Sequence, residues 1–362
     1  GQFRDEYIRH RRRIDDSTIT ELVALTNLLP GPSSSQLGIA IGSLRAGRLG
    51  GLAAWLGFTL PSAIVMTAIG LGIASGDGAG AGWLHGLELV AVPVVLAAVV
   101  AMRATLARGA LRSGFAIAGA AIALTVGGVV GQTVTIAAAA VAGVLLLRQE
   151  APSLDPLLRV PVSRRFGIAC LVTFVLLLGG LAVLAGETRS HTADLADAMY
   201  RAGSLVFGGG HVVLPLLDAS VVEPGWVDKS DFLAGYVAAQ AIPGPLLTFS
   251  AYLGAVAGPE PNGALGAVVA LVAIFIPSFL LLWGILPLWG AARRHTVVQA
   301  AVSGVAAAVV GLLAAALWDP VVRTAVDSVG DLVFAAALLG ALRVLPVWAV
   351  VVVAAAGGAL VF

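Results

Sequence analysis

Apolar runs of about twenty residues, separated by short polar loops, recur along almost the whole chain. The hydrocarbon core of a bilayer is about 30 Å thick, and a helix crosses it with roughly 20 apolar residues. Only 11% of the 362 residues are charged and the mean hydropathy is +0.98, which excludes a soluble enzyme. We expect an all-α polytopic membrane protein with full spans at 50–74, 83–102, 112–130, 132–147, 166–186, 263–290, 296–318, 329–343 and 346–362.

Two shorter apolar segments are interrupted by the tripeptide Pro-Gly-Pro, at 30–32 and at 243–245. The stretches on either side have about a dozen residues each, which as a helix reach about 18 Å, or half a bilayer. Proline lacks an N–H group and glycine is conformationally free, so Pro-Gly-Pro ends one helix and allows another to begin. A third interrupted segment, 199–217, contains Gly208, Gly209, Gly210 and His211.

The charge of the loops indicates how these segments enter the membrane. Arginines stand on both sides of the first break, at positions 4 to 13 and at Arg45 and Arg48. Cytoplasmic loops carry an excess of Lys and Arg, so both flanks are predicted to be cytoplasmic and the segment to be a re-entrant hairpin. Acidic residues dominate the flanks of the second break, which is predicted to enter from outside, and 199–217 is treated as a third hairpin.

Threading the spans from this start assigns the remaining loops to two sides. The outer side receives Asp77, Arg189, Arg201, Asp218, Glu223, Asp228, Lys229 and Arg323. The cytoplasmic side receives Arg103, Arg108, Arg112, Arg148, Arg159, Arg164, Arg165, Arg293, Arg294 and Arg343.

The two halves of the chain repeat one another in opposite orientation. A shift of 213 residues places the first Pro-Gly-Pro on the second, Asn27 on Gln240 and Ser35 on Thr248, and with small gaps the Pro-Ser step at 61–62 meets the one at 277–278. The loops of the first copy are rich in arginine and the matching loops of the second are acidic, as inverted repeats require. We predict a first repeat at 1–150, a cytoplasmic linker at 151–165 and a second repeat at 166–362. A counterpart of the 208–211 segment would precede Gly1, so the first repeat is expected to be incomplete at its N-terminus.

Half-helices that begin inside a bilayer can bind an anion, because a helix N-terminus has unpaired N–H groups and a partial positive charge. Non-helical backbone at this depth is tolerated only where protein or water covers it. Ser33, Ser34, Ser35 and Gln36 follow the first break, and Thr248 and Ser250 follow the second. Their hydroxyl and amide groups can donate hydrogen bonds to a multi-oxygen anion, glycines 208–210 allow close backbone approach, and His211 could donate a hydrogen bond or carry a proton.

A purely structural interpretation competes with this one. Pro-Gly-Pro would then only kink packed helices, the serines would bond to their own carbonyls, and His211 would cap a helix end. Repetition of the motif in opposite orientation favours the anion site. Glu88, one turn after His85, either reaches the membrane interface or is a candidate for proton coupling. The abundant small residues indicate close helix packing. The sequence has no catalytic triad, phosphate-binding loop or metal-ligand cluster, and its one cysteine, Cys170, excludes a disulfide framework, so no enzymatic activity, cofactor or metal is predicted.

Several of these motifs closely resemble those of the chromate transporter family. They are the run ELVALTNLLPGPSSSQ from Glu21 to Gln36, the RAGR of 45–48, the FGGGH of 207–211 and the QAIPGP of 240–245. The similarity covers essentially the whole chain and implies the long, two-domain form of the family, whose members export chromate from the cytoplasm. By position, the resemblance carries site roles to Asn27, Pro30, Gly31, Pro32, Ser33, Gln36, Gly208, Gly209, His211, Gln240, Pro243, Gly244 and Pro245.

Taken together, the residues and the resemblance predict a secondary transporter in the plasma membrane that exports chromate by alternating access. The predicted substrate-binding residues are Asn27, Pro30, Gly31, Pro32, Ser33, Ser34, Ser35, Gln36, Gly208, Gly209, Gly210, His211, Gln240, Pro243, Gly244, Pro245 and Thr248. A transporter of sulfate or another anion and a passive anion channel are the alternatives. The expected partners are the chromate or sulfate anion and the lipid bilayer, not nucleic acid, and a homo-oligomer is left open.

Overall fold

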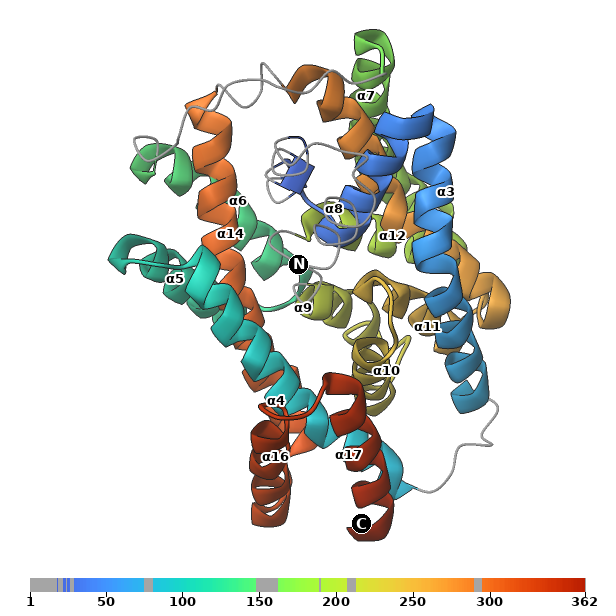
Figure 1. Ribbon diagram of the computed structural model, residues 1–362, viewed down its shortest axis with the longest axis vertical. Coiled ribbons are helices and arrows are strands. Elements are labelled where there is room, and N and C mark those ends of the chain that lie inside the picture. The colour runs from blue at the N-terminus through green and yellow to red at the C-terminus, as the bar shows by residue number, and fades with distance from the viewer. Residues whose placement is uncertain are drawn as a thin grey trace.

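The computed structural model describes residues 18, 22–23, 25–26, 29–74, 81–147, 162–188, 190–206, 213–289 and 295–361. Within these ranges every regular element is a helix and strands are absent, which confirms the all-α prediction for this part of the chain. Figure 1 shows α3 and α14 as long upright helices, with the short helices of the interrupted segments between them. The short elements are α8 (His191–Leu205), α9 (Val213–Leu217), the π-helical η4 (Asp218–Val222), α10 (Lys229–Ala241), the 3-10 turn η5 (Leu246–Thr248) and α11 (Phe249–Val256).

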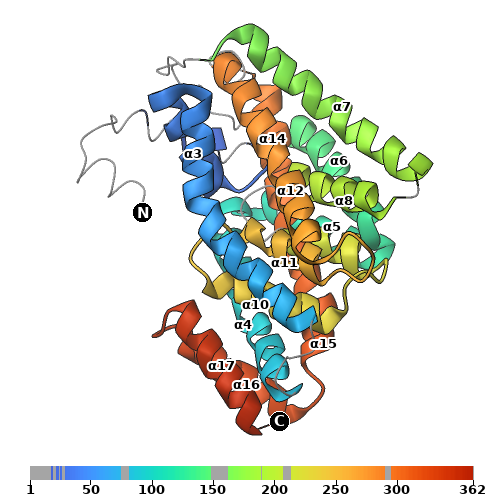
Figure 2. The same cartoon turned by 90° about the vertical axis from the view of Figure 1, so that its right-hand side faces the viewer.

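Five of the described helices are long and apolar enough to cross a membrane. They are α3 (Ser33–Ala74), α4 (Ala81–Leu106), α7 (Arg164–Thr188), α12 (Gly263–Ile285), which continues into η6 (Leu286–Leu288), and α14 (Thr296–Ala316), which continues into η7 (Leu317–Val322) and α15 (Arg323–Ala325). These correspond to the predicted spans 50–74, 83–102, 166–186, 263–290 and 296–318. Only 6% of the apolar window of α7 is buried, and Figure 2 shows this helix along the outer edge of the molecule, as expected for a helix that faces lipid.

The other four predicted spans form shorter helices. They are α5 (Ala110–Val126), α6 (Gly128–Leu146), α16 (Val329–Ala341) and α17 (Val347–Val361). The last two have 13 and 15 residues, so they reach about 20 and 23 Å, less than the roughly 30 Å of a bilayer core. The spans predicted at 329–343 and 346–362 coincide with these helices to within about two residues, the usual uncertainty of a helix boundary, but the helices are shorter than a full crossing, and residues 342–346 form the turn between them. Figure 1 shows this pair at the lower end of the molecule.

A hairpin follows each Pro-Gly-Pro break. Helix α3 is interrupted at Ala46 and at Gly47, whose φ is +65°, so its first leg ends near the predicted end of the hairpin at residue 44. The two legs touch where Gly42 faces the carbonyl of Gly50, and a side chain at either glycine would overlap with the other leg. In the second half, α11 and α12 meet in the same way through Gly254 and Gly266.

Glycines also join α14 to α5 and α6. A Cβ at Gly311 would overlap with a backbone carbonyl of α5, and one at Gly304 with a backbone carbonyl of α6. From the other side, Gly119 and Gly143 face the backbone of α14 in the same manner. The expected role of the small residues in close helix packing is thereby confirmed at these crossings.

Contacts at one end of the molecule join three segments that are distant in sequence. The guanidinium of Arg48, at the turn of α3, lies 4.6 Å from the ring centre of Phe166 near the start of α7. Near the end of α12, Trp283 Nε1 donates to Ser43 Oγ at 2.9 Å. All three segments adjoin loops that the charge pattern assigns to the cytoplasm, and α12 packs against both α3 and α7.

Candidate functional site

The first break is shaped by a glycine that no other residue could replace without strain. Gly31 has a φ of +123°, and a Cβ there would lie 2.6 Å from Ser278 Oγ and would overlap with the amide of Gln36. That amide donates from Nε2 to the carbonyl of Pro30 at 2.6 Å and so holds the chain as it turns into α3. The backbone N–H of Gly31 donates to the carbonyl of Val206, just after α8, at 2.6 Å.

Hydrogen-bond donors remain available at the start of α3. The first helical bond runs from the N–H of Gln36 to the carbonyl of Pro32, at 2.9 Å, so the amides of residues 33–35 have no partner within the helix. The hydroxyls of Ser35 and Ser278 are 1% and 0% exposed and have no hydrogen-bond partner among the described residues. An unpaired buried polar group costs about 1–3 kcal/mol. A ligand that accepts hydrogen bonds would therefore be favoured at this position.

The second break differs in how its hydroxyls are used. Helix α10 ends at Ala241, and the chain turns through Pro243 and Gly244, both exposed, into η5 and α11. The hydroxyl of Thr248 donates to the carbonyl of Pro245 at 2.9 Å, and that of Ser250 donates to the carbonyl of Leu247 at 2.8 Å. Both hydroxyl groups therefore already donate to a nearby backbone carbonyl. The serines of the first break are thus better placed to donate to a ligand.

Each break packs against a Pro-Ser dipeptide in the other half of the chain. Gly31 faces Ser278 of α12, and Gly244 faces Ser62 of α3. A Cβ added at Gly244 would lie 2.6 Å from Ser62 Cβ. Both serines follow the proline inside their helix. Between these contacts α3 and α12 pack directly, with Trp55 edge-on to Phe275 and Phe279 at 5.4 and 5.5 Å between ring centres. Each break is therefore packed against a helix of the other half, and we refer to this arrangement as reciprocal bracing.

The predicted site residues fall into three groups. Gly31, Pro32, Ser35, Gln36, Pro245 and Thr248 are buried, Pro30, Ser33 and Gln240 are half-buried, and Ser34, Pro243 and Gly244 are exposed. Asn27, Gly208, Gly209, Gly210 and His211 lie outside the described residues. Gln240 interacts with Tyr236 one turn earlier on α10.

Sequence reasoning did not select Ser62 and Ser278 as site residues. The repetition of a Pro-Ser dipeptide at equivalent positions of the two halves could have indicated these serines as site residues. Alignment of the two halves does not show, however, which break each dipeptide contacts. That pairing crosses between the halves and emerges only in three dimensions.

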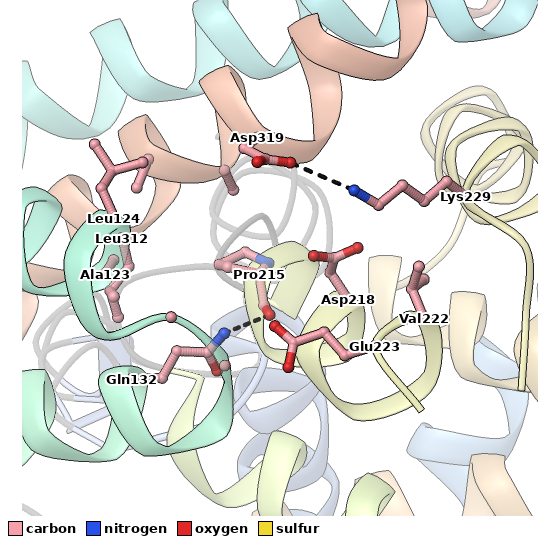
Figure 3. A pocket seen from close by; sticks show the side chains of 14 residues that line it. Ala123, Leu124, Gln132, Pro215, Asp218, Val222, Glu223, Lys229, Leu312 and Asp319 are labelled. Atoms are coloured by element: carbon pink, nitrogen blue, oxygen red, sulfur yellow. Dashed lines mark hydrogen bonds and ion pairs between the residues drawn. The ribbon is translucent and has the colours of Figure 1, made fainter. Parts of the chain in front are cut away.

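A polar cavity of about 300 Å³ lies apart from the breaks (Figure 3). Lys229 Nζ lies 3.4 Å from Asp319 Oδ1 across it, and Gln132 donates to the carbonyl of Pro215 at 2.6 Å. Asp218, outside the five long spans, points into this space, and burial raises its pKa to about 6. Asp218, Glu223 and Lys229, which the charge pattern assigns to the outer side, all line this cavity.

Comparison with known proteins decides the family. The sequence model described as chromate transporter matches residues 1–145 and 193–361 of the chain. A chromate transport protein of Pseudomonas aeruginosa is 30% identical over 92% of this chain and 80% of its own length. The chain belongs to the chromate transporter family.

Two other relatives of this member of the chromate transporter family extend over most of its length. A probable chromate transport protein of Synechococcus elongatus is 23% identical over 88% of this chain and 78% of its own length. A chromate transport protein of Cupriavidus metallidurans is 23% identical over 90% and 78%. No solved structure matches the chain. The match confirms the resemblance inferred from the Pro-Gly-Pro motifs and an ion-transport role in a membrane.

Proposed function

We propose that the protein is a secondary transporter that exports chromate across the plasma membrane by alternating access around the two helix breaks. An inside-negative potential favours the outward movement of an anion by about 2.3 kcal/mol per charge per 100 mV, or about 4.6 kcal/mol for a dianion. Export of chromate therefore needs no nucleotide-hydrolysing domain. Family membership and the similarity to chromate transport proteins support chromate as the substrate.

The reciprocal bracing of the two breaks carries this proposal. Because Gly31 packs on α12 and Gly244 packs on α3, a movement of either hairpin displaces the break of the other half. Alternating access in inverted-repeat transporters consists of such rocking of one half against the other around a fixed site. The family model matches two separate segments, 1–145 and 193–361, and each lies within one of the two predicted repeats, which supports the same organisation.

Contacts at the two ends of the molecule support the predicted topology. Arg48 and Phe166 join two segments that the charge pattern assigns to the cytoplasmic side. Lys229 and Asp319 join two that it assigns to the outer side.

The start of α3 is the proposed anion site. Its free amides and the hydroxyls of Ser35 and Ser278 would donate to the oxygens of a tetrahedral dianion, which the helix dipole also favours. A hydrogen bond to a charged group contributes about 1.5–3 kcal/mol. We therefore expect Ser35→Ala and Ser278→Ala each to weaken chromate binding about tenfold to hundredfold.

Uptake of labelled chromate into proteoliposomes tests the proposal, with and without an imposed potential. Accumulation against the electrochemical gradient supports a transporter and contradicts a passive channel. Competition by sulfate measures selectivity, and stronger transport of sulfate than of chromate would contradict the assigned substrate. Ser250→Ala is the matched control because its hydroxyl bonds to its own helix. An equal loss of affinity in Ser35→Ala and Ser250→Ala would contradict the assigned site.

Labelling of single cysteines tests the inverted orientation. In a Cys170→Ala background, a cysteine at position 46 probes the turn inside α3, and a cysteine at position 259 probes the turn between α11 and α12. We expect a membrane-impermeant thiol reagent to reach position 46 only from the cytoplasmic side and position 259 only from the outer side. Labelling of both from one side would contradict the inverted repeat.

A further inference from the structure

Three ionisable side chains from the two ends of the chain meet at the start of α4. His85 Nδ1 lies 3.3 Å from Glu88 Oε2 on the same helix, and His85 Nε2 lies 3.1 Å from Asp331 Oδ1 on α16. Glu88 is 8% and Asp331 2% exposed. The cluster therefore joins residues separated by 246 positions through one imidazole ring.

Asp331 is held as an anion by its structural role. It stands in the first turn of α16, where its Oδ2 accepts the backbone N–H groups of Asp327 and Ser328 at 3.0 and 2.8 Å. Hydrogen bonds from backbone amides and the positive end of the helix dipole both favour the charged carboxylate. Its second oxygen, Oδ1, is left to accept from His85 Nε2.

The contact between His85 and Glu88 then requires one more proton. A neutral imidazole has a single N–H, and if this points to Asp331, the lone pair of Nδ1 faces the oxygen of Glu88. A proton must lie between them, either on the imidazole as imidazolium or on Glu88 as carboxylic acid. In both arrangements the three groups carry one net negative charge. Loss of the proton leaves two nearby buried carboxylates with no positive partner, which is unfavourable.

The charged groups around the cluster reinforce this preference. Asp231 on α10 and Asp327 before α16 both act on Glu88 with negative charge. Helices α14 and α17, which also pack on α4, have no titratable side chain among Thr296–Ala316 and Val347–Val361. The remaining neighbours, η7 and α15, supply Asp319 and Arg323, which pair with each other at 2.8 Å.

We infer that His85, Glu88 and Asp331 form a proton-binding site that is occupied while α4 is docked on α16. This inference rests on the proposed transport function and adds a coupling ion to it. Helix α4 also packs along α10, which ends at the second Pro-Gly-Pro break. Release of the proton favours separation of α4 from α16, so movement of α4 in the transport cycle is linked to proton binding and release.

The matching position of the second half has no such group. When the repeat is aligned so that Gly86 matches Gly304, Ala306 of α14 takes the place of Glu88, and Ala306 is buried. A carboxylate is thus not required to pack a helix at this place of the fold. The opposite wall of the cluster is formed by α17, because Gly86 lies against the backbone of Ala354.

Chromate flux into proteoliposomes as a function of pH, at a fixed potential, tests the site. The native chain should show a rate that changes by up to about tenfold per pH unit on its limiting arm, as expected for one obligatory proton. The double variant His85→Gln/Glu88→Gln keeps two polar side chains but has no group beside Asp331 that can exchange the shared proton, and its profile should be flat. Glu187→Gln, at the exposed end of α7, is the matched control and should keep the native profile.

A second measurement does not depend on transport. Potentiometric titration of the purified full chain counts bound protons, and His85→Gln/Glu88→Gln should exchange about one proton fewer than the native protein between pH 4 and 9. Parallel flux profiles and equal proton counts for the native chain and the double variant would overturn the proton site, even if the variant melts at a lower temperature. Absence of chromate flux in the native chain would instead contradict the proposed function and leave the proton count to decide the site.

Discussion

Replacing Gly244 by alanine tests the brace between the second break and α3. The added Cβ would lie 2.6 Å from Ser62 Cβ and would overlap with Ser62 Oγ. The φ of Gly244 is not in the left-handed region, so alanine adds no backbone strain. The effect is therefore steric, and overpacking of this kind costs about 1–3 kcal/mol. We expect the melting temperature to fall by several degrees.

Ser62→Gly provides the rescue, because it removes both overlapping atoms. Glycine inside a helix costs about 0.5–1 kcal/mol by itself. The double variant Gly244→Ala/Ser62→Gly should nevertheless be more stable than Gly244→Ala, with a coupling of about 1–2 kcal/mol in the double-mutant cycle. Transport by the double variant should recover with its stability.

The first break supplies the matched control. A Cβ at Gly31 would lie 2.6 Å from Ser278 Oγ, but the φ of +123° strains any other residue at this position whatever the space. Ser278→Gly should therefore restore Gly31→Ala only in part. Melting in detergent, followed by intrinsic fluorescence, compares the two cycles. Strict additivity at Gly244 and Ser62, or equal rescue in both pairs, would refute the reasoning.

Three further predictions concern other parts of the molecule. Burial raises the pKa of Asp218 from 3.8 to about 6, which favours folding below pH 4 by a contribution that is lost as the pH rises through 6. Asp218→Asn should therefore stabilise the protein by about 3 kcal/mol more at pH 8 than at pH 4, and parallel melting curves would contradict this. Gly311→Ala should destabilise by about 1–3 kcal/mol because its Cβ overlaps with the α5 backbone, whereas Gly340→Ala, with open space around it, should be neutral or stabilising in the same melting assay. Tyr252→Phe removes a 2.8 Å hydrogen bond to a backbone carbonyl of α10 and should cost about 0.5–1.5 kcal/mol in chemical denaturation, and no change would show that bond to be unimportant.

The features that sequence reasoning predicted well are local. Pro-Gly-Pro ends one helix and starts another because of the covalent properties of its residues, and the structure shows both breaks at these positions. The long spans follow from composition alone. Helices α16 and α17 lie where the apolar runs predicted them, but each is too short for a full crossing because Arg343 and Pro346 stand in the turn that separates them.

The features that escaped prediction depend on contacts between distant segments. Thr248 and Ser35 occupy equivalent positions in the repeat, yet one hydroxyl bonds to the local backbone and the other has no partner among the described residues. This difference depends on the backbone geometry after each break, which composition does not determine. Likewise, Glu88 and His85 were recognised as neighbours on one helix, but Asp331 joins them from the far end of the chain.

Because each break contacts the Pro-Ser dipeptide of the other half, the two halves depend on one another for assembly. Neither half alone holds both partners of these contacts, because the serine that faces each glycine belongs to the other half. A chain of half this length would have to recruit a second polypeptide to complete the same contacts. Covalent linkage of both halves supplies each with its complement in a fixed one-to-one ratio, and it frees the two copies to diverge.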